Sequence, residues 1–459
     1  MQLLKSIKRY IFSFEKYNSC KKNKKKQFLH FLSFYICCNI LMKKHYSSIE
    51  IMSPAGSYEA LMAAIQAGAD AVYFGVGEMN MRARSSINFT LDDLEKLTHI
   101  CKKNNVLSYL TVNTVIYNRE IEKMTLLLDA AKKCGVSAII ASDMAVVNYC
   151  KKIGLEIHIS TQCNITNIEA VKFYAQFADV IVLARETELK DVAQIVKQIH
   201  KENICGPKGE LIKIEMFIHG ALCMAVSGKC YISLDNFNYS ANRGACLQPC
   251  RRGYIVKDID SEIDLVVENQ YIMSPKDLCT IGFLNKILDA GVTVLKIEGR
   301  GRSPEYVKMV TQCYHEAVEA IQNNTFTIEK IDNWTNRLRS VYNRDFWEGY
   351  YLGRKTGEWT QNYGSQATRT KQYVGKIINY YSNLKVAEIL IETNEINVDD
   401  DIMVFGPTTG IVDVKVDEIR VDLKPVSQAF KGEYCSIPIQ ELVRKNDKVY
   451  KWLNMNDEL

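Results

Sequence analysis

The sequence lacks a strong excess of charge of either sign, and it lacks an apolar run long enough to span a membrane. Its 459 residues include 58 lysines and arginines against 53 aspartates and glutamates, a formal net charge of +5. This balance permits a nucleic-acid partner but does not argue for one, because dedicated nucleic-acid binders are usually more basic. The most apolar run, residues 27–42, is shorter than the about 20 residues that a membrane-spanning helix needs.

Two motifs of common peptidases are also missing. The sequence contains no HExxH, the helix motif of zinc peptidases, and no GxSxG, the tight turn that presents a nucleophilic serine. Ser227 has a glycine neighbour but lies between cysteines rather than near a plausible base. A cysteine nucleophile assisted by His219 is conceivable, yet a cluster of cysteines is more typical of metal ligands. Peptide hydrolysis is therefore the less favoured chemistry.

The first 41 residues differ in kind from the rest of the chain. They are rich in lysine and then apolar, without the small-residue cleavage site of a signal peptide. The segment that begins at Met42 resembles the start of an ordinary cytosolic protein. We expect residues 1–41 to be a disordered or mis-assigned extension; the alternative is an anchor or targeting peptide.

Cysteine, in contrast, is abundant, with 15 residues. Several stand singly in apolar segments, where a reduced, buried thiol is the ordinary interpretation, and a chain of this length is no small disulfide scaffold. Examples are Cys101, Cys134, Cys150 and Cys313. This usage indicates a reducing compartment, and we expect a cytoplasmic protein.

Four further cysteines lie close together with the spacing C-x6-C-x15-C-x3-C: Cys223, Cys230, Cys246 and Cys250. Glycines stand between them, which lets the backbone bend sharply around a cluster. The two tight cysteine pairs of a zinc ribbon are absent. The spacing favours an iron–sulfur cluster, while structural zinc, disulfides or free thiols remain alternatives. Cys279 is a reserve ligand that could replace Cys250.

From residue 48 to 305 short β-branched runs alternate with amphipathic helical segments. Runs that are apolar on both faces are typical of parallel strands covered by helices, so we predict an α/β fold, a TIM-like (β/α)8 barrel. The cysteine-rich segment is then an insertion between the last two strands. The expected strands are residues 49–55, 70–76, 106–113, 137–143, 155–160, 179–185, 213–220 and 293–299.

The remainder of the chain has a different pattern. Residues 306–370 are helical and then rich in aromatic residues and glycine, as expected of a connecting region. Residues 371–455 contain short alternating strands separated by turn residues, one of them expected at 412–421. This pattern predicts a small C-terminal β-barrel domain.

Polar residues stand at the ends of several predicted barrel strands, where side chains point into the mouth of such a barrel. Each alone could be a structural ion pair, but together they exceed what a barrel core tolerates. We therefore predict a polar, ligand-binding mouth, whose arginines suit an anion or an RNA backbone. The substrate-binding candidates are Asn113, His158, Gln162, Arg185 and Arg300, and the catalytic candidates are Glu215, His219, Lys296 and Glu298.

Six segments of the chain resemble the peptidase U32 family, which includes collagenase-like proteins. They are residues 53–75, 158–167, 215–233, 242–251, 273–278 and 296–307. The closest resemblance is to the branch that hydroxylates tRNA uridine to 5-hydroxyuridine at the wobble position with prephenate.

The resemblance implies a [4Fe–4S] cluster on the four clustered cysteines and tRNA as a partner. It also implies prephenate as a small anionic cosubstrate, for which Lys296 and Arg300 are the nearest cationic candidates. A homo-oligomer or a paralogous U32 partner is compatible with the family. We expect no membrane association unless residues 1–41 are a genuine part of the protein. The alternatives are a U32-type peptidase, or hydroxylation of an rRNA base or a quinone ring.

Overall fold

The structure is a computed structural model that describes residues 49–84, 88–255, 270–354 and 356–455. The predicted extension at residues 1–41 and the apolar run at 27–42 lie outside these residues. Within the described ranges, no helix combines the length and apolar character needed to cross a membrane.

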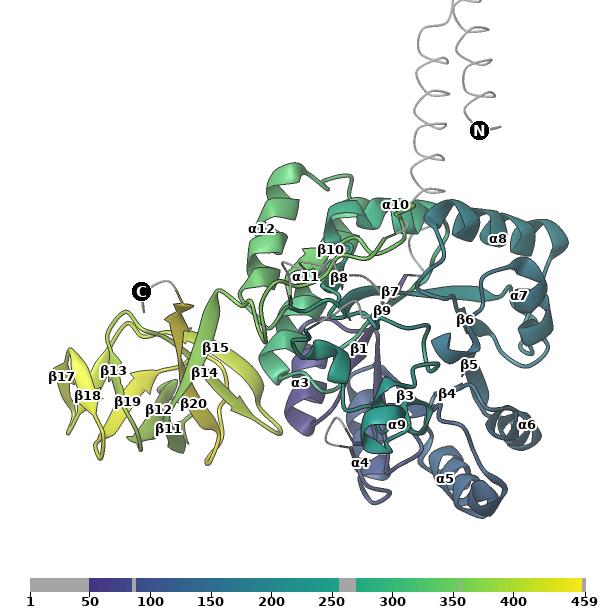
Figure 1. Ribbon diagram of the computed structural model, residues 1–459. Helices are drawn as coiled ribbons and strands as arrows, with labels where there is room; N and C mark the ends of the chain where they lie inside the picture. The colour runs from purple at the N-terminus through teal and green to yellow at the C-terminus, as the bar shows by residue number, and fades with distance from the viewer. Residues whose placement is uncertain (1–48, 85–87, 256–269, 355, 456–459) are drawn as a thin grey trace, which may run out of the picture. The chain divides into compact units, whose positions relative to one another are not determined.

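Eight parallel strands close into a barrel, which confirms the predicted TIM-like fold (Figure 1). The strands run in the order β7-β6-β5-β4-β3-β2-β1-β9, and pairing of β7 with β9 closes the ring. Their bounds are β1 (Glu50–Pro54), β2 (Ala71–Gly75), β3 (Leu107–Val112), β4 (Ala138–Ala141), β5 (Glu156–Ile159), β6 (Val180–Val182), β7 (Lys213–Ala221) and β9 (Val294–Ile297).

Helices between the strands bury one apolar face each against the barrel. In α8 (Leu189–Glu202), for example, Val192, Ile195 and Ile199 are buried at spacings of three and four residues. Ser57 caps α3 (Tyr58–Gln66) by accepting a hydrogen bond from the backbone of Ala60. The others are α4 (Asp93–Lys103), α5 (Ile121–Cys134), α6 (Met144–Ile153), α7 (Ile168–Ala175) and α10 (Leu284–Asp289), and α11 (Pro304–Gln322) follows the last barrel strand.

The segment between β7 and β9 contains a strand that the sequence pattern did not predict. β8 (Asp277–Cys279) pairs antiparallel with the end of β7, and β10 (Phe346–Trp347) adds beside it. With three residues and two, these strands are too short for a recognisable alternating pattern. The same segment holds the short helix α9 (Ile232–Phe237), and α12 (Ile328–Arg339) follows α11.

The C-terminal region is an antiparallel sheet of eight strands in the order β15-β14-β20-β11-β12-β19-β16-β17. Buried residues from nearly all of these strands share one apolar core, so the predicted β-rich region is present as an antiparallel sheet. Its closure into a small β-barrel domain stays a prediction. The strands are β11 (Arg369–Tyr381), β12 (Val386–Ile391), β14 (Asp401–Gly406), β15 (Gly410–Lys415), β16 (Ile419–Val421), β17 (Lys424–Val426), β19 (Tyr434–Pro438) and β20 (Lys448–Asn454).

One predicted strand of this region, residues 412–421, is two strands in the structure. β15 ends at Lys415 and β16 begins at Ile419. Between them Val416 leaves the ladder and its backbone N–H donates to the carbonyl of Asp400. A separate pair, β13 (Glu395–Asn397) and β18 (Gln428–Phe430), completes the region.

Candidate active site

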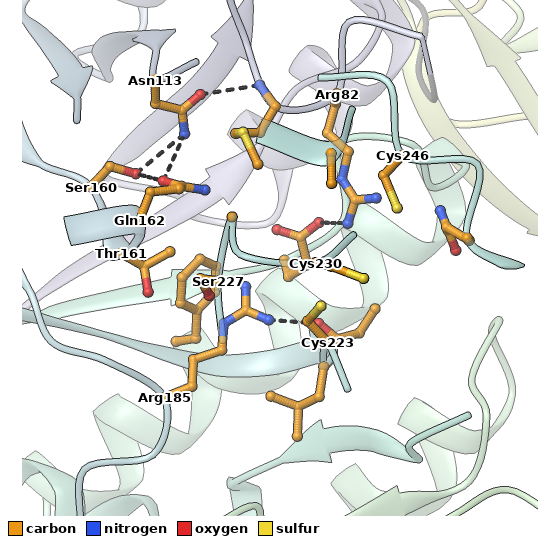
Figure 2. A pocket seen from close by; sticks show the side chains of 18 of the residues that line it. Arg82, Asn113, Ser160, Thr161, Gln162, Arg185, Cys223, Ser227, Cys230 and Cys246 are labelled. Carbon is orange, nitrogen blue, oxygen red and sulfur yellow. Dashed lines mark hydrogen bonds and ion pairs between the residues drawn. The ribbon is translucent and has the colours of Figure 1, made fainter. Parts of the chain in front are cut away.

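A cavity of about 170 Å³ lies at the carboxyl ends of the barrel strands, beneath the cysteine-rich insertion (Figure 2). Strands end there with their side chains directed into the mouth, as the fold requires. Its polar and charged lining comes from the strand ends and from the insertion: Tyr73, Arg82, Thr111, Asn113, Ser160, Thr161, Gln162, Arg185, Ser227, Gln248, Arg251, Lys296, Glu298 and Arg300.

All four clustered cysteines line this cavity, and none of them forms a disulfide. Tight turns bring them together. At Gly244 the backbone has a φ of +74°, and a Cβ there would lie 2.1 Å from the carbonyl oxygen of Asn80. Only glycine fits this approach, because any side chain would collide with that backbone. The sequence therefore folds the insertion onto the loop that follows β2.

The surroundings of the thiols combine burial with nearby cationic groups. Burial raises the pKa of Cys246, and it raises the pKa of Cys250 to about 11, while Arg82 and Arg251 oppose the two shifts. Such thiols keep their protons until a metal displaces them. The cavity lining holds five cationic side chains against one carboxylate, Glu298, so it can balance the charge of several thiolates.

Four free thiols that line one cavity could serve as the ligands of a metal centre. Within the described ranges, no three histidine, cysteine or acidic side chains already lie close enough together to hold a metal ion. Cys279 does not line the cavity.

Three predicted residues at the end of β9 line the cavity together, each with its own partner. Lys296 Nζ lies 2.7 Å from Glu215 Oε1, and Glu298 Oε1 lies 2.6 Å from Arg82 Nη2. Arg300 donates to Thr111 Oγ1 over 2.9 Å. Burial would raise the pKa of Glu298, but the neighbouring guanidinium of Arg82, with Arg185 and Arg300, lowers it to about 2. Glu298 is therefore a fixed anion rather than a base.

Glu215 and His158 lie beneath the cavity rather than in its lining. Glu215 is fully buried, and its second carboxylate oxygen is 3.5 Å from His158 Nδ1. The other ring nitrogen of His158 lies 3.8 Å from Glu156. Burial disfavours the charged forms of Glu215 and His158, but their ion pairs have the larger effect. The pKa of Glu215 is therefore lowered and the pKa of His158 is raised. These groups form a buried chain of alternating charge that supports Lys296.

His219 is placed away from the cavity, among aromatic rings. Its ring lies 5.4–6.0 Å from those of Tyr306, Tyr314 and Phe346. Burial lowers its pKa to about 3, so it remains neutral at ordinary pH. In a regular strand His219 would share a face with Phe217, which does line the cavity. A bulge between the two residues turns the imidazole to the other side of β7.

The other predicted substrate-binding residues form one wall of the cavity. Asn113 Nδ2 donates to Ser160 Oγ and to Gln162 Oε1, each over 3.2 Å. Arg185 lies 3.9 Å above the ring of Phe217 and donates to the carbonyl of Ala221. Its Nε has no hydrogen-bond partner among the described residues. Side-chain amides and a guanidinium can form hydrogen bonds with the polar atoms at the edge of a small ring.

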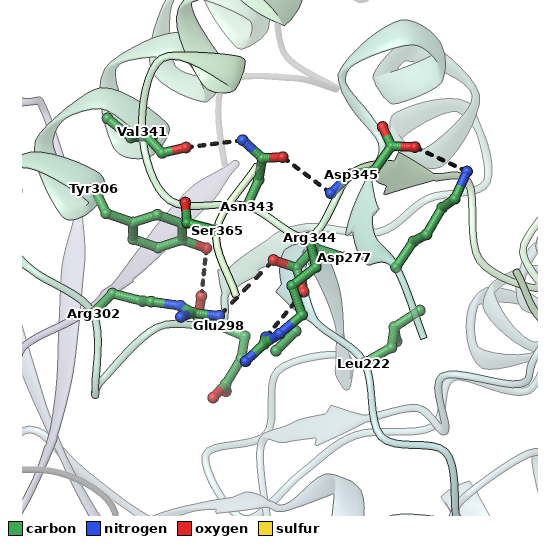
Figure 3. Close-up of polar contacts among 12 residues, drawn as sticks. Leu222, Asp277, Glu298, Arg302, Tyr306, Val341, Asn343, Arg344, Asp345 and Ser365 are labelled. Carbon is green, nitrogen blue, oxygen red and sulfur yellow. Dashed lines mark hydrogen bonds and ion pairs between the residues drawn. The ribbon is translucent and has the colours of Figure 1, made fainter. Parts of the chain in front are cut away.

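A second polar network braces the segment that follows β9 (Figure 3). Asp277 on β8 lies 3.9 Å from Arg302 and 3.5 Å from Arg344. Tyr306 donates to the backbone carbonyl of Glu298 over 2.9 Å, which holds this cavity residue in place. The network therefore links the wall of the cavity to segments far along the chain.

Several polar side chains of the cavity were not predicted from the sequence, among them Tyr73 and Thr111 on the barrel strands. Both stand in the middle or near the end of apolar strands and face the barrel interior. Tyr73 donates to the carbonyl of Ile297 over 2.8 Å. A tyrosine hydroxyl in a strand that is otherwise buried was the available signal, because such a group must find a partner.

Comparison with known proteins gives consistent matches. The model of Peptidase family U32 matches residues 56–361. A Porphyromonas gingivalis protein named collagenase is 59% identical over 406 residues, covering 88% of this chain and 98% of its own. A tRNA hydroxylation protein of Bacillus subtilis is 31% identical over 368 residues, covering 78% and 83%. One from Helicobacter pylori is 32% identical over 319 residues, covering 67% and 72%.

Proposed function

Because the chain belongs to peptidase family U32, we propose that it is an iron–sulfur enzyme that hydroxylates RNA. Its proposed substrate is the wobble uridine of tRNA, its product 5-hydroxyuridine and its cosubstrate prephenate. The proposal places the reaction in the cytoplasm, with or without a paralogous family partner. The observation that carries it is the convergence of four free cysteines on one cationic cavity at the mouth of a barrel.

In this proposal the four thiolates of the cavity hold a [4Fe–4S] cluster, which supplies redox chemistry when bound. Lys296 and Arg300 bind the carboxylates of the cosubstrate. Gln162 donates a hydrogen bond from Nε2 to the polar edge of the base, and Asn113 holds the Gln162 amide in place. Glu298 stays ionised and orients Arg82, since its pKa is low. Two relatives named as tRNA hydroxylation proteins support the choice of substrate.

A second candidate is peptide hydrolysis, favoured by the 59% identical relative that is named collagenase. A cysteine peptidase needs a base within hydrogen-bond reach of its nucleophile. No histidine lines the cavity in the described part of the chain, and His219 lies among aromatic rings instead. This geometry supports hydroxylation over hydrolysis.

The cofactor is tested by anaerobic purification. We expect a brown protein with about four irons per chain, and Cys→Ala at Cys223, Cys230, Cys246 or Cys250 should remove both colour and iron. Cys279→Ala is the matched control and should keep them, because Cys279 lies outside the cavity lining. Stoichiometric zinc in the wild-type protein would contradict the cluster.

The substrate is tested by mass spectrometry of tRNA nucleosides from a strain that lacks the gene. We expect 5-hydroxyuridine to fall and to return with the wild-type gene but not with a Cys223→Ala gene. An unchanged 5-hydroxyuridine pool, together with gelatin cleavage by the purified protein, would establish the peptidase instead. Tight tRNA binding without any change in modification would indicate a non-catalytic RNA-binding protein.

A further inference from the structure

Exposed apolar and aromatic side chains surround the mouth of the cavity. On the cysteine-rich insertion, Tyr231 is 74% exposed, Val226 47% and Leu247 42%. Tyr117, in the loop after β3, is 47% exposed. Single exposed apolar residues need no explanation, but several around one opening are typical of a binding surface. We call these four residues the rim.

The rim lies directly beside the cavity. Tyr231 stands between the cavity residues Cys230 and Ile232, and Leu247 stands between Cys246 and Gln248. Backbone hydrogen bonds hold the insertion over the barrel loops, from Arg84 to Gly244 and from Val115 to Asn242, each 3.2 Å long. A polymer that lies on the rim can therefore place one of its units in the cavity.

Cationic groups accompany the aromatic ones. The guanidinium of Arg84 lies 4.9 Å from the ring centre of Tyr239, and that of Arg252 lies 5.0 Å from that of Phe237. Residues 223–255 carry four lysines and arginines and one acid, Asp235. Arg84 and Arg252 are themselves exposed, so cationic groups stand beside the aromatic rings of this surface.

We propose that the rim binds an unpaired RNA loop. Nucleotides on either side of the reacting base stack on Tyr231 and on Tyr117, whose ring centre also lies 4.6 Å from the guanidinium of Arg243. Arg84 and Arg252 contact phosphates. Aromatic side chains bind splayed, single-stranded bases in this way, whereas an A-form duplex hides its bases from them. The inference rests on the proposed function in one respect: it takes the polymer to be RNA.

Binding is tested with the full-length protein and a fluorescein-labelled RNA hairpin that has an unpaired loop. Base stacking on an aromatic ring contributes enough that Tyr231→Ala should weaken binding on the order of tenfold, and Tyr117→Ala similarly. The matched control is Phe173→Ala on α7, an exposed ring on an outer helix that should bind normally. Thermal unfolding of each variant confirms that the fold is intact.

The phosphate contact is tested by salt dependence. The logarithm of the association constant falls linearly as the logarithm of the salt concentration rises. Arg84→Ala should make this slope less steep by about 0.7, as expected for one lost phosphate contact to single-stranded RNA. Lys133→Ala, on the outer helix α5, should leave the slope unchanged. An unchanged slope for Arg84→Ala would overturn the assigned contact.

Three results would overturn the proposal: normal binding by both tyrosine variants, equal affinity for a fully paired duplex of the same sequence, or gelatin binding that depends on Tyr231. The assay needs neither cluster nor cosubstrate, so it separates the two proposals. Rim-dependent hairpin binding with unchanged tRNA modification contradicts only the proposed function. Hydroxylation with normal binding by the rim variants contradicts only the rim.

Discussion

At the scale of single residues, the buried ion pairs organise the cavity. Lys296 lines the cavity and forms an ion pair with Glu215 beneath it, and Glu215 also lies next to His158. Burying charges is unfavourable unless each has a partner, and here the partners alternate in sign. The chain thereby keeps a cation at the floor of the cavity.

Changing Lys296 to Met should abolish uridine hydroxylation while leaving the iron content unchanged. Losing one partner of a buried pair costs about 3–5 kcal/mol when the other is left alone. Because His158 still faces Glu215, we expect a smaller loss of unfolding free energy, measured by urea titration. Lys213→Met, at the exposed start of β7, is the control. Loss of iron or of the fold would make Lys296 a structural residue.

The His158–Glu215 pair predicts how stability changes with pH. The folded-state pKa of His158 is raised above 6.5, so its contribution is complete below pH 6.5 and is lost as the pH rises through the folded pKa. The pKa of Glu215 is lowered below 4.5, so its contribution is complete above pH 4.5 and is lost as the pH falls through the folded pKa. The pair therefore contributes most between these values.

Urea unfolding of a His158→Gln variant checks this pH dependence. The variant should show a smaller alkaline loss of unfolding free energy than the wild type. His200→Gln, at the exposed end of α8, should behave as the wild type does. Identical pH profiles for the wild type and His158→Gln would show that the imidazole is not charged in the folded protein.

At the scale of elements, the insertion depends on one close backbone approach. The backbone at Gly244 lies against the carbonyl of Asn80, which sets the insertion on the loop after β2. Two of the cavity cysteines, Cys246 and Cys250, follow this contact in the chain. Their position is therefore determined by packing of loop on loop.

Gly244→Ala should displace the insertion and reduce the iron content of the purified protein. The added methyl group meets backbone at 2.1 Å, which no side-chain movement relieves. Gly209→Ala is a matched control, since Gly209 has a similar φ of +79° but open space around it. It isolates backbone strain, about 1 kcal/mol, from the collision. Equal iron in the two variants would contradict this account.

At the scale of the whole molecule, Asp277 ties distant segments together. It stands on β8, while Arg302 follows β9 and Arg344 follows α12 (Figure 3). Only 2% of its side chain is exposed, so solvent screens these ion pairs little. The network joins the insertion, the barrel and the connecting region.

Asp277→Asn should lower the unfolding free energy by about 3–5 kcal/mol, because two guanidinium groups lose their buried counterion. Asp345→Asn is the comparison: Asp345 pairs with Lys276 over 2.9 Å but is more exposed, so about 0–1 kcal/mol is expected. Urea titration measures both. Similar losses for the two variants would show that burial does not set the strength of the Asp277 network.

Much of the architecture followed from local pattern. Local sequence was enough to predict the eight barrel strands and the helices between them, because strand and helix periods span only a few residues. The cysteine spacing is likewise visible in one short segment. Asn113, Gln162, Arg185, Lys296, Glu298 and Arg300 were placed at the mouth because barrel strands end there, and all of them line the cavity. The roles proposed for them stay predictions.

What the sequence by itself determined is thus which elements exist, in what order, and which polar residues stand at their ends. The tertiary structure alone decided the partners: Lys296 pairs with Glu215 rather than Glu298, and His219 turns away from the cavity. It also decided that β8 joins the end of β7. The physical reason is that one bulged residue reverses the side that a strand presents, and pairing joins residues far apart in sequence.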